Sequence, residues 1–312
     1  MDNYTASVNL VETKKELKTG YGALAIVSFF WGTTYIASKI GTHHMPGLFI
    51  AGVRQFISGL IMVSFFLLRG HKLPSLQEFK KIAVQGIFLL CISNGLLTWA
   101  LEYITSGLGA IIAALVPMFI TLFSIWLTRR AKITRPMILG MIMGFAGVVT
   151  IFYDYIGEVS HSSFLFGAGL AMLSVISWSF GTVYTSKQKP GINVLFNVGL
   201  QMLIAGIILL PVCFISGKYV NITHIGTTAW SALLYLILFG SLLAYSAYVV
   251  AISKLPPTLV SIYAYINPVV AVVFGWLLLN EKMNTNMILG TAITLCGVYI
   301  VNRSFKKQAY AI

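Results

Sequence analysis

Residues 256–303 read PPTLVSIYAYINPVVAVVFGWLLLNEKMNTNMILGTAITLCGVYIVNR, and an earlier stretch of the chain repeats their pattern. That stretch, residues 107–152, reads GLGAIIAALVPMFITLFSIWLTRRAKITRPMILGMIMGFAGVVTIF. Each copy consists of two apolar runs joined by a short charged turn. Pro117 corresponds to Pro268 in the first run, and Met-Ile-Leu-Gly recurs at 137–140 and 287–290 in the second. Such self-similarity indicates a duplicated unit.

The duplication extends upstream, because the motif Trp-Gly-Thr-Thr-Tyr at 31–35 resembles Phe-Gly-Thr-Val-Tyr at 180–184. We therefore predict two repeats, residues 21–155 and 164–303. A polar N-terminal tail of residues 1–20 and a short C-terminal tail of residues 304–312 flank them.

The composition is that of a polytopic membrane protein. Hydrophobic residues make up 58% of the chain and charged residues only 9%, against roughly 25% charged in soluble domains. Crossing the hydrocarbon core takes about 20 apolar residues in a helix. Ten runs approach that length, and we expect transmembrane helices at about 21–40, 47–68, 82–103, 107–128, 136–154, 164–187, 192–215, 229–252, 257–279 and 284–302.

The lysines and arginines of the loops predict the orientation. With the N-terminus inside, the basic residues of the N-terminal tail and of segments 69–81, 129–135, 187–189, 254 and 303–307 share the cytoplasmic side. Lys39, Lys218 and Lys282 fall outside, so both termini are predicted to be cytoplasmic in the plasma (inner) membrane. Five helices per half make the repeats inverted, a construction typical of secondary transporters. The expected fold is thus all-α, with ten transmembrane helices as two inverted five-helix repeats.

Several other classes of protein lack support in the sequence. The formal charge of +13 is spread over loops, so no nucleic-acid partner is expected. Cys91, Cys213 and Cys296 have neither disulfide nor zinc spacing, and His43-His44 has no acidic or cysteine neighbour in its loop. No ATP-binding, hydrolase or metalloprotease motif is present. We predict no cofactor, no metal and no enzyme activity.

Polar residues inside the predicted spans mark the candidate site, because polar groups in hydrocarbon face a bundle interior or a cavity. They recur at spacings of three and four on single helical faces, which we interpret as the walls of a central cavity. The deeper tryptophans and tyrosines fit either a cavity wall or ordinary helix packing. The candidate substrate-binding residues are Trp31, Thr34, Tyr35, Arg54, Asn94, Thr98, Trp178, Gln201, Tyr245 and Tyr263.

Arg54 is the only charge well inside a predicted span and needs a partner. Glu102, near the outer end of the third helix, is one candidate, and the carboxylate of an organic substrate is the other. A purely structural role, in which Arg54 extends toward the interface or caps carbonyl groups, is the alternative. Glu102 is also the candidate for proton coupling.

In several motifs the chain resembles the EamA-like branch of the drug/metabolite transporter superfamily. These are the 5+5 repeat, Trp31-Gly32, Arg54, Pro117 with Pro268, and Asn280-Glu281-Lys282, and the likeness covers about residues 21–303. It implies an export-type carrier of amino acids or related small metabolites. It also implies a central cavity lined by the first four helices of each half, with the fifth and tenth helices as supports.

Two departures from the relatives bear on mechanism. By the resemblance, the first-half turn should carry a glutamate like Glu281, but residues 128–131 read Thr-Arg-Arg-Ala. The small multidrug relatives use a carboxylate in the first helix to exchange protons with cations, and none occurs between Tyr21 and Ile40.

The expected function is secondary transport, by alternating access, that exports amino acids or similar small metabolites. Efflux of aromatic or amphipathic toxic compounds is the second reading, favoured by the aromatic wall. A membrane-embedded lipid enzyme is the third, with Glu102, Asp154 and Glu158 as its acidic residues. The expected partners are a small-molecule substrate and the lipid bilayer; the sequence does not indicate an oligomeric state.

Overall fold

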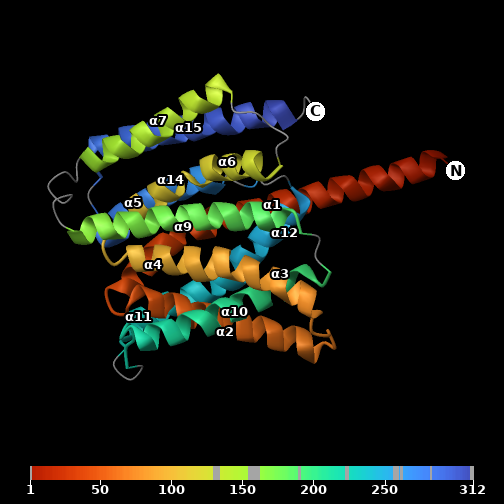
Figure 1. The fold of residues 1–312 in the computed structure, drawn as a ribbon, viewed down its shortest axis with the longest axis horizontal. Coiled ribbons are helices and arrows are strands. Elements are labelled where there is room, and N and C mark those ends of the chain that lie inside the picture. Colours follow the sequence, from red (N-terminus) through yellow and green to blue (C-terminus); the bar gives the residue numbers. More distant parts are fainter. Residues whose placement is uncertain are drawn as a thin grey trace.

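The computed structural model describes residues 2–128, 134–153, 162–188, 191–221, 225–255, 260, 263–281 and 283–309. Over these residues the chain is helical and contains no strand, which confirms the all-α prediction. The helices run along a common direction, and the first turns of α1 extend beyond the rest of the bundle (Figure 1). The predicted N-terminal tail therefore continues the first helix from Asp2 on.

The helices of each half appear in the same order. The first half contains α1 (Asp2–Thr42), α2 (Gly47–Leu68), α3 (Leu76–Gly86), η1 (Ile87–Asn94), α4 (Gly95–Ala100), α5 (Ser106–Ala113), α6 (Val116–Thr128) and α7 (Arg135–Tyr153). The second half contains α9 (Ser162–Ser186), α10 (Val194–Ile215), α11 (Thr227–Tyr235), η3 (Leu236–Tyr245), α12 (Ser246–Lys254), α14 (Tyr263–Leu279) and α15 (Thr285–Ala309).

Local sequence explains several of the helix boundaries. Ser75 and Glu78 form a capping box at the start of α3, which satisfies amide groups that the first turn leaves without helical partners. The Asn193 side chain does the same for α10, accepting from the amides of the next turn. The fourth helix is interrupted between α5 and α6, just before Pro117, whose ring nitrogen cannot donate a helical hydrogen bond.

Each half also contains a π-helical segment, η1 or η3, in the middle of its third helix. Such turns are rare and occur frequently at functional sites, because they reorient the side chains that follow. No sequence pattern predicted them.

Within the described part of the chain, seven helices are long and apolar enough to cross a membrane: Glu16–Thr42, Gly47–Leu68, Leu76–Ala100, Ser106–Leu127, Ser162–Ser186, Val194–Ile215 and Thr227–Lys254. Three shorter apolar helices, Arg135–Gly147, Ile266–Leu279 and Thr285–Val301, lie where the other three spans were expected. The multi-pass architecture is confirmed. The total of ten spans stays a prediction.

The contacts between the halves come in matched pairs. α1 packs on α14 and on the helix formed by α11, η3 and α12, while α9 packs on α5 and α6 and on the helix formed by α3, η1 and α4. Two homologous pairs complete the bundle. α2 packs on α10, and α7 on α15, at opposite edges in Figure 1. This is the pattern that two repeats related by a two-fold axis produce.

Glycines reveal the same two-fold relation at the level of single residues. A methyl group on Gly59 would lie 2.2 Å from the backbone nitrogen of Leu203, and one on Gly206 would lie 2.4 Å from the backbone of Phe56. The same number of residues separates Gly59 from Gly206 and Phe56 from Leu203, so the two contacts are equivalent. They allow α2 and α10 to approach backbone to backbone.

The pair α7 and α15 shows the same reciprocity. Gly140 faces the carbonyl of Gly297, and Gly147 faces the carbonyl of Gly290. The glycine faces of α7 and α15 are therefore helix-packing surfaces. Neither helix contributes a described residue to the lining of the cavity described below, and the supporting role that the resemblance implies for them stays a prediction.

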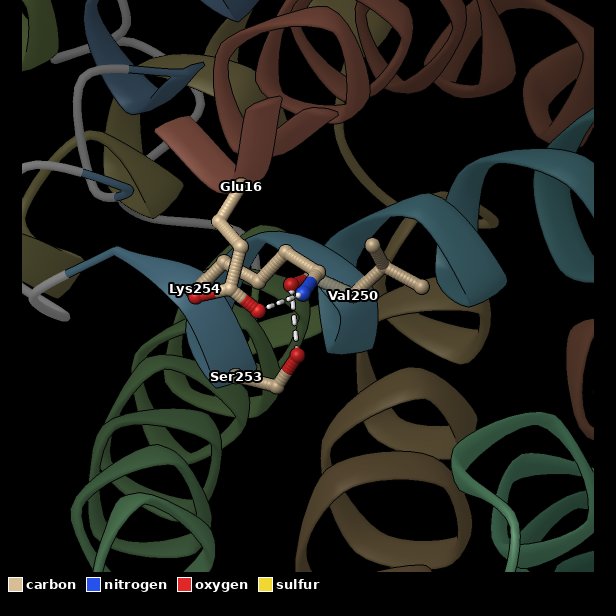
Figure 2. A network of polar contacts seen from close by, with 4 residues as sticks. All are labelled: Glu16, Val250, Ser253 and Lys254. Atoms are coloured by element: carbon tan, nitrogen blue, oxygen red, sulfur yellow. Dashed lines mark hydrogen bonds and ion pairs between the residues drawn. The ribbon is translucent and has the colours of Figure 1, made fainter. Parts of the chain in front are cut away.

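One ion pair joins distant parts of the described chain. Lys254, at the end of α12, lies 2.8 Å from the carboxylate of Glu16 in α1, and the neighbouring Ser253 hydroxyl donates to the carbonyl of Val250 (Figure 2). Because the Glu16 side chain is 66% exposed, such a contact contributes little to stability.

Candidate functional site

A central cavity lies between the two halves, lined by residues of α1, α2, η1, α4, α5, α6, α9, η3 and α14. Its volume is about 90 Å³, several times the roughly 10–15 Å³ that one water molecule needs. Both π-helical segments contribute to its wall, through Leu90, Ser93 and Asn94 in η1 and Gly240 and Tyr245 in η3. The described part of α10 contributes none of these residues, although the resemblance implied that it would.

Most of the candidate residues come together in this one place. Those that line the central cavity are Trp31, Thr34, Tyr35, Arg54, Asn94, Thr98, Trp178, Tyr245 and Tyr263. Gln201 is the exception. That these side chains bind a substrate stays a prediction.

Sequence reasoning missed other polar lining residues, including Gln55, Ser93 and Asn267. Gln55 adjoins Arg54 in sequence and is 1% exposed. Its amide donates to the Asn94 side chain at 3.2 Å, while its own oxygen has no hydrogen-bond partner among the described residues. No spacing in the sequence marked Gln55 as a lining residue, since adjacent residues of a helix point about 100° apart.

Arg54 is the only charged residue among the described residues that line the cavity. It is 5% exposed, and its Nε donates to the Ser241 hydroxyl at 2.7 Å. That is the only hydrogen bond of its guanidinium to the described residues. The terminal nitrogens lie over Gly240, where an added methyl group would be 2.7 Å from Nη2. Four N–H donors of the guanidinium thus remain available on the cavity side.

The proposed pairing of Arg54 with Glu102 is wrong. Glu102 lies outside the cavity lining, and its carboxylate accepts the amide of Gly47 at 2.5 Å, in the first turn of α2. Helix N-termini favour negative groups, which explains this placement. Arg54 lies in α2 and Glu102 in the turn that follows α4, and their side chains have different partners.

An aromatic cluster forms one wall of the cavity. The Trp31 ring is 5.2 Å from that of Trp178, 5.0 Å from Tyr248 and 5.1 Å from Tyr263. The Trp31 indole donates to the Gly240 carbonyl at 3.2 Å. The three tilted or edge-on contacts of the Trp31 ring are favourable arrangements, so this wall is apolar with polar edges.

Gln201 lies behind the cavity. It is completely buried, and its amide donates to the side chains of Gln85 at 2.7 Å and Asn197 at 2.8 Å. Its oxygen accepts the hydroxyl of Tyr245, whose ring faces the cavity. Gln201 therefore does not line the central cavity, contrary to the prediction, because Tyr245 covers it on that side.

Glu281 follows α14 and reaches the N-terminus of α5. One carboxylate oxygen accepts the Ser106 amide at 2.9 Å, and the other accepts the Ser106 hydroxyl at 2.8 Å and the Gly107 amide at 3.3 Å. The Lys39 ammonium donates to carbonyls of the preceding turn, Leu101 and Ile104, at 2.8 and 2.9 Å. The side chains of the matching first-half turn lie outside the described residues.

Some groups named in the sequence play no part in this site. Asp154 and Glu158 lie outside the described residues. Among the residues that are described, no three His, Cys, Asp or Glu side chains gather as a metal site requires.

Known proteins and a family model match this chain over most of its length. The model of the EamA-like transporter family matches residues 18–153 and again residues 165–303. The "Uncharacterized inner membrane transporter YedA" of Escherichia coli is 34% identical over 92% of each chain. The "Uncharacterized transporter YvbV" of Bacillus subtilis is 28% identical over 92% of this chain and 93% of its own.

A solved crystal structure has the same fold, with a TM-score of 0.65 over 94% of this chain and 99% of that chain. At 17% identity the likeness concerns the fold alone. The relatives are named as transporters, and both repeats of this chain match a transporter model. The cavity is therefore the cavity of a multi-pass membrane transporter.

Proposed function

This chain belongs to the EamA-like transporter family, and from that premise we propose that it exports amino acids or related small metabolites that carry a carboxylate. The cavity is the place where the substrate binds. Arg54, Asn94 and the other lining residues predicted above contact it.

Arg54 is the observation that carries this proposal. A buried charge without a counter-charge is costly in a protein interior, and the described residues offer the guanidinium one hydroxyl and no carboxylate. A substrate carboxylate supplies the missing charge and accepts two parallel N–H bonds from the planar group. A cationic substrate would meet a charge of the same sign and no acidic side chain among the described residues of the lining.

The neutral polar groups suit the other end of an amino acid. The Gln55 oxygen has no donor among the described residues, and it lies beside Asn94 in the same wall. An ammonium group needs such acceptors. The aromatic wall of Trp31 and Trp178 adds favourable interaction with a cation, so a zwitterion with its carboxylate toward Arg54 satisfies both sets of groups.

Alternating access follows from the architecture in this proposal. Ten spans in two inverted repeats exchange their conformations when one half rocks on the other. The reciprocal glycine contacts of Gly59 and Gly206 support this, since they relate the halves residue by residue. The loop charges support an orientation with both termini in the cytoplasm, in a plasma (inner) membrane.

Proton coupling has one candidate carrier, Glu102, and it lies outside the cavity lining. Its carboxylate is held by the amide of Gly47. This favours a facilitator that follows the substrate gradient, and coupling through Glu102 is the alternative.

Efflux of aromatic or amphipathic toxic compounds is the second candidate function. The cluster of Trp31, Trp178, Tyr248 and Tyr263 favours it, because aromatic faces bind planar apolar molecules. A lipid enzyme has less support. The names of the family and of the relatives are those of transporters.

Flux measurements test the proposal. Purified protein in proteoliposomes is loaded with single radiolabelled amino acids and assayed with and without an imposed pH gradient. We expect efflux of at least one amino acid that does not respond to the pH gradient. A gradient-driven flux abolished by Glu102→Gln would establish coupling instead. Absence of amino-acid flux, together with drug resistance in cells that overexpress the protein, would favour the efflux function.

A further inference from the structure

A second pocket of about 290 Å³ lies on the opposite side of Gln201 from the central cavity. The end of α9, the start of α10, α3 and α12 surround it, and it includes Ser253, which adjoins the ion pair drawn in Figure 2. By the predicted orientation this is the cytoplasmic end of the bundle. Its lining is rich in amides, hydroxyls and charges, including Gln85, Asn197, Glu78 and Lys81.

One hydrogen-bond chain connects the two spaces. Tyr245 lines the central cavity, and Gln85 and Asn197 line the second pocket. Gln201 lines neither, is completely buried and bonds to all three. Side chains therefore separate the two spaces along this line, and these four residues are called the Gln201 latch below.

The helices pack closely at the latch, but the side chains that close it are held together by hydrogen bonds between uncharged groups. At Gly86 an added methyl group would lie 2.8 Å from the Gln201 carbonyl oxygen, so the backbones of α3 and α10 meet here. The bonds join amides and a phenol, none of which is charged. Such bonds exchange for bonds to water or to a polar solute at little net cost. A barrier of this kind closes a pathway and still opens reversibly.

The sequence repeat shows that Arg54 and Gln201 occupy equivalent positions in the two halves. Gly52-x-Arg54 in α2 matches Gly199-x-Gln201 in α10, since Gly52, Gly59, Gly199 and Gly206 have the same spacing in the two helices. In the first half this position is Arg54, whose charged side chain faces the cavity. In the other half it is an uncharged amide behind Tyr245.

We propose that the Gln201 latch is the gate between the substrate cavity and the cytoplasm, and that the second pocket is the vestibule through which polar solutes reach it. The gate must open once in each transport cycle. This inference rests on transport by the chain and is independent of which substrate is carried.

Cysteine labelling tests the gate without any substrate. Cys91, Cys213 and Cys296 are replaced by alanine, and Ala113, a half-buried cavity residue, becomes the reporter in Ala113→Cys. A membrane-impermeant maleimide is applied to the cytoplasmic face in inside-out vesicles and to the outer face in right-side-out vesicles. Gln201→Leu keeps the bulk of the side chain and removes its three hydrogen bonds.

We expect Gln201→Leu to raise the labelling rate from the cytoplasmic face about tenfold, the change that loss of roughly one net hydrogen bond gives. Labelling from the outer face should not rise. Tyr245→Phe removes only the hydroxyl of the latch and should give a smaller increase of the same sidedness. Thr121→Val removes a buried hydroxyl that bonds to the Pro117 carbonyl and lines neither pocket; it is the matched control and should leave the labelling rates unchanged.

Unchanged cytoplasmic labelling in Gln201→Leu and Tyr245→Phe would overturn the proposal. An equal rise from both faces would also overturn it, since it would report loosening of the bundle. If Gln201→Leu does not fold, Tyr245→Phe and Gln85→Ala decide the question. Because the readout needs no flux, a protein that carries no amino acid can still show a gated vestibule.

Discussion

Replacing Arg54 by methionine should abolish discrimination between a carboxylate and its uncharged amide. Arg54 uses one N–H on Ser241, which leaves its terminal N–H groups for two parallel bonds to a carboxylate. Hydrogen bonds to charged groups contribute about 1.5–3 kcal/mol each. If the pair contributes about 2–4 kcal/mol after desolvation, the apparent affinity for the acid falls about 30- to 1,000-fold in Arg54→Met.

The assay compares inhibition constants in proteoliposomes. The amino acid with the largest flux and its carboxamide compete with the labelled substrate, in the wild-type protein and in Arg54→Met. The acid should lose most of its affinity in the variant, while the amide changes little. Arg54→Lys, which keeps the charge without the planar fork, should be intermediate.

Two controls separate binding from folding. Gln55→Met changes the adjacent buried side chain and leaves the charge, so the ratio of acid to amide affinity should be retained. Arg54→Met removes a buried charge, so the thermal unfolding temperature should not fall. Equal weakening of acid and amide, or of neither, would refute the reasoning and return Arg54 to a structural role.

Three further predictions follow from close contacts. Gly240→Ala should displace the Arg54 guanidinium, 2.7 Å from the new methyl group, and weaken acid binding about tenfold with little effect on the amide. Gly59→Ala and Gly206→Ala should each lower the free energy of unfolding by similar amounts in thermal unfolding. The steric cost of about 1–3 kcal/mol exceeds the ~1 kcal/mol gained in helix propensity. Glu281→Gln should lower it by about 1–3 kcal/mol, through loss of charge-assisted bonds to α5.

A control variant and two contradicting outcomes test these predictions. Gly22 has no atom within 4 Å of an added methyl group, so Gly22→Ala should not destabilise the protein. Markedly unequal effects of Gly59→Ala and Gly206→Ala would contradict the equivalence of the two contacts. Wild-type stability of Glu281→Gln would show that solvent replaces the carboxylate at the start of α5.

The sequence predicted which helices carry polar faces, and in most cases which side chains meet. Trp31, Thr34 and Tyr35 share a face because helical periodicity is independent of tertiary structure, and each lies on the cavity wall. The internal repeat was also predicted from the sequence. It makes α7 and α15 equivalent helices of the two halves, and their glycines meet in matching contacts.

The sequence did not predict whether a polar side chain borders the cavity or lies behind another side chain. Gln201 and Arg54 look alike in sequence as polar groups in the seventh and second helices. Whether such a group borders the cavity depends on the rotation of another helix, which brings Tyr245 in front of Gln201. The partner of Glu102 was missed for the same reason, since a backbone amide of the next helix leaves no pattern in the side chains.

The duplicated pair Arg54 and Gln201 allows a test of how the halves have diverged. In an exchange variant, Arg54→Gln with Gln201→Arg, the charge moves to the matching position of α10. There it faces Gln85, Asn197 and the Tyr245 hydroxyl, which are neutral. A buried charge with no counter-charge is destabilising by several kcal/mol. The exchange variant should therefore have a lower unfolding temperature than Arg54→Gln alone, and acid binding as weak as in that single variant. An exchange variant that binds the acid with wild-type affinity would mean that the two positions are interchangeable, and that Gln201 borders the substrate rather than the gate.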